Sequence, residues 1–364
     1  MTKNKFCVCM AVLFLMASCN TQTIDREGVN NATRNQKEEL DFVRTKATKF
    51  EKNTSKHWEA ELDNGITFIY VPEGSFTMGN NANETALPEH KVNLSHYWIS
   101  KTPITTGQFR EFVEETGYKT EVLNEGHTGP YVYDFEIEAF KPKYGYYWDN
   151  AFKDILAHFP EITIDDSHPV SSISWNDAVA YTQWLSKKTA LEISLPTEAE
   201  WEYAAKGTDG RIYPWGNEIP DGTRANYADE TMQKFFPNLE QAFTHFGVTD
   251  GYAITSPVGS FPAGASPVGA LDMAGNLTEW VYDSAYKLTK EQAVEVTNPI
   301  NTIKNGENQE KGGLWCGSAG REGQDPDEIK YGHNVRTDTR PADETDSADD
   351  HMGFRIAISY TKRN

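Results

Sequence analysis

Cysteine is scarce in this sequence, and its placement excludes a disulfide-stabilised domain. Three of the four cysteines, Cys7, Cys9 and Cys19, lie within the first 19 residues, and Cys316 lies near the other end. The first two belong to a segment that has the layout of a removable leader. The folded region therefore keeps one thiol, Cys316, and an internal disulfide is excluded.

Positive charge is also scarce. The 364 residues contain 34 Lys and Arg against 54 Asp and Glu, a net charge of −20. This charge argues against nucleic acid as a partner and against direct binding to an anionic membrane surface. We find no P-loop, no Gly-x-Ser-x-Gly and no dinucleotide fingerprint. His168, His245, His333 and His351 show no close metal-ligand spacing.

The N-terminus has the layout of a targeting segment. Lys3 and Lys5 precede an apolar run over 6–16 that is too short to span a bilayer, and small residues then precede Cys19. This ending resembles a bacterial lipobox, in which Cys19 is lipidated after cleavage. An ordinary signal peptide with an incidental cysteine is the alternative. We expect a lipoprotein signal peptide at 1–18 and a bacterial cell-envelope protein, lipid-anchored at the periplasmic face or the outer-membrane surface and touching membrane only through that anchor.

Composition then divides the mature chain in two. Residues 19–57 are mostly polar and predict a tether, with a short helix around 38–50. Residues 58–364 carry the core, with 27 Gly in the whole chain indicating a turn-rich, irregular domain. The patterns predict a hairpin turn at 64–65, strands at 66–71, 92–99, 275–282, 312–316 and 353–360, a continuation of the first sheet edge over 72–79, and helices at 108–116, 176–188 and 197–206. Thr197 and Glu200 have the spacing of a capping box.

Several short motifs occur in a fixed order. They are Gly74–Gly79, Pro88–Val92, Pro103–Thr105, His168–Val170 with Ser174–Ala178, Leu195–Ala205, Pro257–Phe261, Asp272–Asn276 with Glu279-Trp280, Gly312-Gly313, and Arg340 with Gly353–Arg355. In this order they resemble the formylglycine-generating enzyme (sulfatase-modifying factor) family over roughly residues 64–360. The resemblance implies an α+β fold: irregular, loop-rich and C-type-lectin-like, with short antiparallel strands and a few helices.

The resemblance also implies structural calcium. One set of ligands would be Asn226, the carbonyl of Tyr227, Asp250 and the carbonyl of Tyr252. A second would be Asp272, Gly275, Leu277 and Glu279, with the middle pair acting through carbonyls. Calcium prefers such hard oxygen ligands. The alternative is that Asp250 and Asp272 cap turns.

Family enzymes oxidise a cysteine of a type I sulfatase to formylglycine, and the aerobic ones bind copper(I) through two cysteines. Counting back from Arg340, the second falls near Gly332 and the first near Cys316 or Asp327. Leu314 stands where the family has an active-site Ser, and Thr278 where it usually has Trp. Cys316 is thus the one candidate catalytic residue. We do not expect copper, although His333 or His351 would be the residues to complete a site with Cys316.

Three functions remain open. The first is an envelope lipoprotein that supports maturation of type I sulfatases for the breakdown of sulfated polysaccharides, with a sulfatase as partner. The second is a non-catalytic lipoprotein of a gliding-motility or secretion complex. The third is binding or processing of sulfated glycans through the aromatic-rich segment 131–148, whose alternative role is packing in the core.

Overall fold

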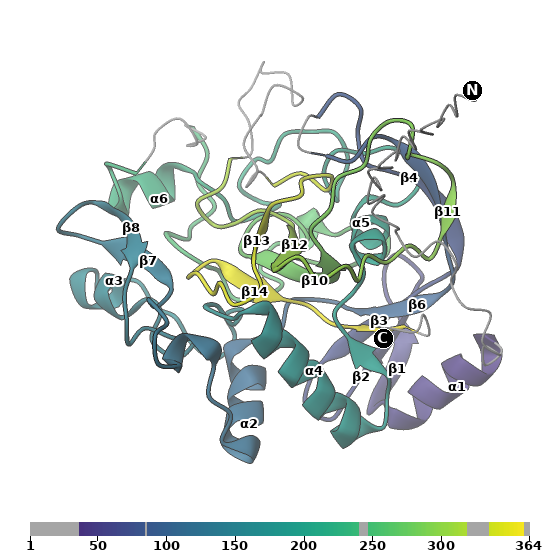
Figure 1. Ribbon diagram of the computed structural model, residues 1–364, viewed down its shortest axis with the longest axis horizontal. Helices are drawn as coiled ribbons and strands as arrows, with labels where there is room; N and C mark the ends of the chain where they lie inside the picture. Colours follow the sequence, from purple (N-terminus) through teal and green to yellow (C-terminus); the bar gives the residue numbers. More distant parts are fainter. Residues whose placement is uncertain (1–35, 84–85, 240–246, 319–334, 360–364) are drawn as a thin grey trace, which may run out of the picture.

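The computed structural model describes residues 36–83, 86–239, 247–318 and 335–359 (Figure 1). The fold is α+β, with short, mostly antiparallel strands, a few helices and long irregular connections, as the sequence predicts. The expected lipidation residue Cys19 lies outside the described residues, as do Asp327, Gly332, His245 and His333.

The largest sheet has six strands in the order β1-β2-β3-β6-β15-β9. Their bounds are β1 Lys49–Lys52, β2 Trp58–Glu61, β3 Thr67–Val71, β6 Tyr97–Ser100, β15 Ala357–Ile358 and β9 Ile193–Ser194. The hairpin between β2 and β3 turns at Asn64-Gly65, where Gly65 has a φ of 78°. The sheet therefore joins residues from both ends of the described chain.

The folded region begins before the predicted boundary at residue 58. Helix α1 (Gln36–Lys46) buries Val43 and Glu39, and β1 pairs with β2. The described part of the predicted 19–57 tether is thus packed on the domain from residue 36. Phe50 explains this difference, because its ring stacks on Trp58 at 4.9 Å and closes the edge of the sheet.

Two amphipathic helices contribute to the core of this sheet. Helix α2 (Thr106–Thr116) and helix α4 (Trp175–Thr189) bring Phe109 and Tyr181 together, with ring centroids 5.8 Å apart. Both helices begin with a capping box, from Thr105 and Ser174. These caps satisfy N–H groups that a helix start leaves unpaired, and they fix where each helix begins.

Helix α5 (Glu198–Lys206) is buried along its whole length and lies against two smaller sheets. Its capping box between Thr197 and Glu200 is formed as the sequence predicts. The four-stranded sheet has the order β13-β12-β10-β14, with β13 Ala342–Glu344, β12 Glu307–Lys311, β10 Thr278–Ser284 and β14 Met352–Phe354. The three-stranded sheet has the order β11-β5-β4, with β11 Val296–Thr297, β5 His90–Leu94 and β4 Gly74–Met78.

Four strand predictions need correction. The run predicted at 353–360 is not one strand, because β14 and β15 belong to different sheets. Residues 72–79 do not extend the first sheet, because β4 pairs with β5 in a sheet of its own. The alternating run 92–99 is two strands, β5 and β6, that belong to different sheets. Residues 312–316 form a turn after β12 rather than a strand, since Gly312 and Gly313 have φ values of 97° and 74°.

The aromatic-rich segment forms a separate unit beside the sheets, at the left of Figure 1. It contains the hairpin of β7 (Tyr131–Asp134) and β8 (Ala139–Pro142) and the short helix α3 (Lys153–His158), near α6 (Glu230–Phe235). Short 3-10 turns occupy Glu121–Leu123 and Pro262–Gly264. Phe236 packs between Tyr133 and Trp315 and ties this unit to the turn that carries Cys316.

Candidate functional site

The four-stranded sheet assembles the neighbourhood of Cys316. Strand β10 pairs antiparallel with β12 and parallel with β14, so Thr278, Glu310 and Met352 lie close together. After β12 the chain turns at Gly312-Gly313, where Gly275 N–H donates to the Gly312 carbonyl at 2.7 Å. Trp315 N–H then donates to the Asn276 carbonyl at 3.1 Å. These bonds fix the position of Cys316.

Cys316 is half-buried beside a fully buried tryptophan. Trp315 packs on Phe140 and Phe236, with ring centroids 6.1 and 6.0 Å away. Burial, together with the negative charge of Asp350, raises the pKa of the Cys316 thiol well above its ordinary value. A thiolate is the form that attacks substrates and binds copper(I), and it is usually favoured by a nearby cation. Here the neighbouring charge has the opposite sign.

An acidic cluster surrounds the adjacent histidine. His351 Nδ1 lies 3.4 Å from Asp350 Oδ1, and the Thr278 hydroxyl donates to the His351 carbonyl at 3.0 Å. Although burial opposes protonation, Asp350, Asp349 and Glu310 raise the pKa of His351 to about 9. Burial raises the pKa of Asp350 to about 6 and that of Glu310 to about 7.

Three polar atoms of this region have no hydrogen-bond partner among the described residues. They are Glu310 Oε2, Asp350 Oδ2 and Trp315 Nε1, all buried. A buried polar atom without a partner costs about 1–3 kcal/mol, so such atoms mark a place where a ligand, water or partner group is expected. The described ranges contain no group of three or more His, Cys, Asp or Glu side chains that could hold a metal ion.

The first predicted calcium set is brought together. Asp250 accepts hydrogen bonds from the Tyr227 and Tyr252 N–H groups at 3.1 and 2.8 Å. Asn226 donates to the Ile254 carbonyl at 2.7 Å, and its Oδ1 is buried without a partner in the described part of the chain. Burial, with the charge of Asp229, raises the pKa of Asp250. The unpartnered amide oxygen of Asn226 and the buried carboxylate of Asp250 are hard oxygen ligands of the kind that calcium prefers.

The second predicted set does not fit a calcium ion. Both carboxylate oxygens of Glu279 are taken by the buried Arg355 guanidinium, and Trp201 Nε1 donates to Oε2 at 2.7 Å. Arg355 also donates to the Leu271 carbonyl at 2.8 Å and to the Asp272 carbonyl at 3.2 Å. Asp272 Oδ2 accepts from Gly259 N–H, and Gly275 and Leu277 belong to the turn before β10. The positive charge at this position is already supplied by Arg355.

Sequence reasoning missed Asp229, Glu310 and Asp350. Asp229 is the N-cap of α6, and its side chain also accepts a hydrogen bond from Asp250 N–H. An acidic residue before a short helix would have been the signal for this cap. Glu310 lies in the polar strand sequence Glu307–Lys311, which carries no apolar alternation from which its burial could be inferred.

Comparison with known proteins places this geometry in a family. The model of the sulfatase-modifying factor enzyme 1-like domain matches residues 54–360. The formylglycine-generating enzyme of Thermomonospora curvata is 31% identical over 312 residues, which cover 79% of this chain and 92% of the relative. The chain belongs to the sulfatase-modifying factor family. No described helix is both long enough and apolar enough to cross a membrane.

Family members of two kinds are similar to this chain. The inactive Cα-formylglycine-generating enzyme 2 of Bos taurus is 30% identical over 314 residues, covering 82% of this chain and 90% of that protein. The structure of PvdO from Pseudomonas aeruginosa superimposes with a TM-score of 0.57 at 25% identity, over 86% of this chain and 98% of PvdO. An enzyme and an inactive relative are equally similar, so family membership alone does not decide whether Cys316 is catalytic.

Proposed function

We propose that this chain is a lipid-anchored envelope member of the sulfatase-modifying factor family that binds a protein partner without oxidising its cysteine. The family makes a type I sulfatase the first partner to test. The observation that carries the proposal is the environment of Cys316. This thiol is the one cysteine after residue 19, and burial beside Asp350 raises its pKa.

The chemistry of copper(I) supports this proposal. A soft copper(I) site is built from thiolates, and two are needed for a linear site. After residue 19 the chain offers one thiol, and its neighbour is a carboxylate that disfavours the thiolate. Oxidation by the family mechanism therefore lacks its metal ligands.

The surroundings of Cys316 favour binding instead. Glu310 Oε2 and Asp350 Oδ2 supply two acceptors, and Trp315 Nε1 supplies one donor, with no partners in the described residues. Among the described residues, the carboxyl groups of Asp350, Asp349 and Glu310 face His351 and raise its pKa. A basic segment of a partner protein would complement this charge.

The first experiment separates binding from oxidation. The full chain and the Thermomonospora curvata enzyme are incubated with copper and a peptide of the Cys-x-Pro-x-Arg type, and aldehyde is measured by mass spectrometry. The control enzyme should form the aldehyde, and this chain should form none while retaining the peptide or a reduced sulfatase in a binding assay. Aldehyde formation that disappears in Cys316→Ser would overturn the proposal.

The lipid anchor rests on the motif that ends at Cys19. Cells fed a radiolabelled fatty acid should label the protein, and Cys19→Ser should abolish the label and release the protein from the membrane fraction. Cross-linking in envelopes then identifies the partner. Recovery of a gliding-motility or secretion complex in place of a sulfatase would favour the second version of this binding role.

Calcium is proposed for the first set alone. Asn226, Asp250 and the Tyr227 and Tyr252 carbonyls would hold the ion, with Asp229 next to them. Its role is structural, because these residues come from separate loops that a cation would join. Isothermal titration should give one calcium site per chain, lost in Asp250→Asn and kept in Asp272→Asn.

A further inference from the structure

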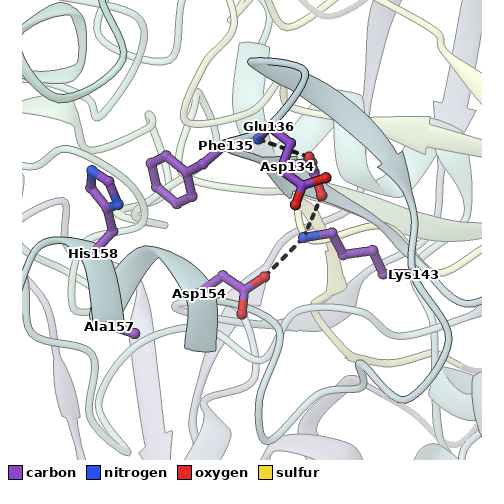
Figure 2. Close-up of a pocket in the computed structure, with 7 residues that line it drawn as sticks. All are labelled: Asp134, Phe135, Glu136, Lys143, Asp154, Ala157 and His158. Carbon is purple, nitrogen blue, oxygen red and sulfur yellow. Dashed lines mark hydrogen bonds and ion pairs between the residues drawn. The ribbon is translucent and has the colours of Figure 1, made fainter.

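An open pocket lies in the aromatic-rich unit, apart from Cys316. Its volume is about 340 Å³, and it is lined by Asp134, Phe135, Glu136, Lys143, Asp154, Ala157 and His158. The hairpin and the turn after it supply one side, and helix α3 supplies the other (Figure 2). Glu136, Ala157 and His158 are exposed, so a ligand can reach the pocket from solvent.

One side of the pocket is formed by a stacked aromatic pair. The rings of Phe135 and His158 are stacked with centroids 4.1 Å apart and an interplanar angle of 12°. Figure 2 shows this pair facing the charged residues across the pocket. Because the two rings cover each other's inner faces, a ligand packs against this pair only on an outer face or on the ring edges.

The opposite side is a charge-balanced polar wall. Lys143 Nζ lies 2.8 Å from both Asp134 Oδ2 and Asp154 Oδ2. Hydrogen bonds from Lys141 and Lys143 hold the pKa of Asp134 well below its ordinary value. Three cations (Lys141, Lys143 and Lys153) thus accompany the three carboxylates (Asp134, Glu136 and Asp154). Neither a cation nor an anion is favoured by the local net charge.

The wall still presents both donors and acceptors. Lys143 has three N–H donors, of which two point to carboxylates, while the exposed Glu136 adds acceptor oxygens at the rim. A flat platform opposite alternating donors and acceptors matches a molecule with hydroxyls around an apolar ring face.

Exposed aromatics continue beside the pocket. Within the described ranges, three of the four exposed large hydrophobic side chains belong to this segment, namely Tyr131, Ile137 and Tyr144. Core burial accounts for Tyr133 and Tyr146, but not for Tyr131 and Tyr144, which are 49% and 68% exposed. Neither of these two exposed rings lines the pocket.

From these features we propose that this pocket binds a sugar unit of an uncharged polysaccharide. The sugar ring packs on the outer face of the stacked Phe135–His158 pair, and its hydroxyls bond to Lys143, Asp154 and Glu136. The balanced charge disfavours a sulfated sugar, which would meet three carboxylates and an ammonium that is already paired. The site is independent of the partner binding proposed near Cys316, although β7 is joined to that region through the Tyr131 N–H bond to Asp349 at 2.9 Å.

Affinity electrophoresis of the full chain in detergent tests this site. The gels contain unsulfated glucan, galactan, mannan or xylan, and one galactan is also supplied in sulfated form. At least one unsulfated polymer should retard the protein. Phe135→Ala should weaken this binding roughly tenfold through loss of the stacking face. Glu136→Gln, an exposed change that leaves folding intact, should weaken it roughly threefold.

Tyr144→Ala is the matched control, because it removes an exposed aromatic that does not line the pocket. It should change binding less than Phe135→Ala does. Failure of every unsulfated polymer, retardation by the sulfated galactan alone, or an equal loss in Tyr144→Ala would each overturn the proposal. Binding of a basic peptide that depends on Phe135, with no glycan binding, would assign the pocket to a partner's Lys or Arg instead.

Discussion

Helix α5 and the region around Cys316 both bury carboxylates, but they compensate them differently. Glu198 is paired with Arg340, and Glu202 with Lys311 at 3.0 Å and with Gly79 N–H at 2.8 Å. Near Cys316, Glu310 and Asp350 each keep one oxygen without a partner among the described residues.

The pKa values follow this difference. Although burial opposes ionisation, Arg340 holds the pKa of Glu198 below its ordinary value. Burial raises the pKa of Glu310 to about 7, since His351 compensates it only in part. In α5 the buried charges are paired, whereas near Cys316 unpaired ones remain, as is common where a ligand or partner binds.

The largest effect is expected from breaking a scaffold pair. Arg355→Met leaves the Glu279 carboxylate buried without a cation, and this should cost about 3–5 kcal/mol of unfolding free energy. Urea unfolding measures the loss. Adding Glu279→Gln should restore part of it, because the uncompensated charge is removed. A loss of under 1 kcal/mol would contradict the view that the scaffold depends on pairing its buried charges.

Calcium should supply the cation that Asp229 and Asp250 lack. At about 100 times its dissociation constant it should add about 2.7 kcal/mol of unfolding free energy, seen as a higher melting temperature than in chelator. Asp250→Asn should abolish this gain and Asp272→Asn should keep it. No calcium-dependent stabilisation of the unmodified chain would count against the site.

Asp229 and Asp250 also predict that the unfolding free energy depends on pH when calcium is absent. Because the folded pKa of Asp250 is raised, its contribution to stability is present below its unfolded pKa and is lost as pH rises through the folded value. In chelator, unfolding free energy should therefore fall more steeply toward alkaline pH in the unmodified chain than in Asp250→Asn.

Glu310→Gln should change the unfolding free energy by less than Arg355→Met does, and it should raise it. With a folded pKa of about 7, Glu310 loses its stabilising contribution as pH rises through that value. The variant should be more stable than the unmodified chain by about 2 kcal/mol above this pH and nearly equal to it in mild acid. Glu198→Gln, at the paired position, should instead be destabilised at the higher pH. If both variants changed the unfolding free energy in the same direction at this pH, helix α5 and the region around Cys316 would not differ in how they compensate buried carboxylates.

Local signals predicted the scaffold well. The capping box at Thr197 and Glu200, the amphipathic helix near 176–188 and the Asn64-Gly65 turn are set by neighbouring residues, and all are present. The order of the motifs was sufficient to predict the family and the fold class.

Long-range packing accounts for most of what the sequence did not reveal. Strand β4 leaves the first sheet because Phe76 and Met78 pack in the core under α5. Strand β1 joins the sheet through Phe50 and Trp58, in a stretch whose composition resembles a tether. The pairing of Glu279 with Arg355 could not be read from spacing, because 75 residues separate the two in the chain.

The rate of Cys316 alkylation as a function of pH measures the pKa of the thiol on which the proposed loss of oxidation rests. Mass spectrometry of the Cys316 peptide follows the reaction in the full chain, with the urea-unfolded chain as reference. The folded thiol should react more slowly than the unfolded one at neutral pH and should reach half its maximal rate above the ordinary thiol pKa of 9.0. A thiolate already formed at neutral pH, with stoichiometric copper(I) binding that Cys316→Ser abolishes, would contradict the proposed loss of oxidation.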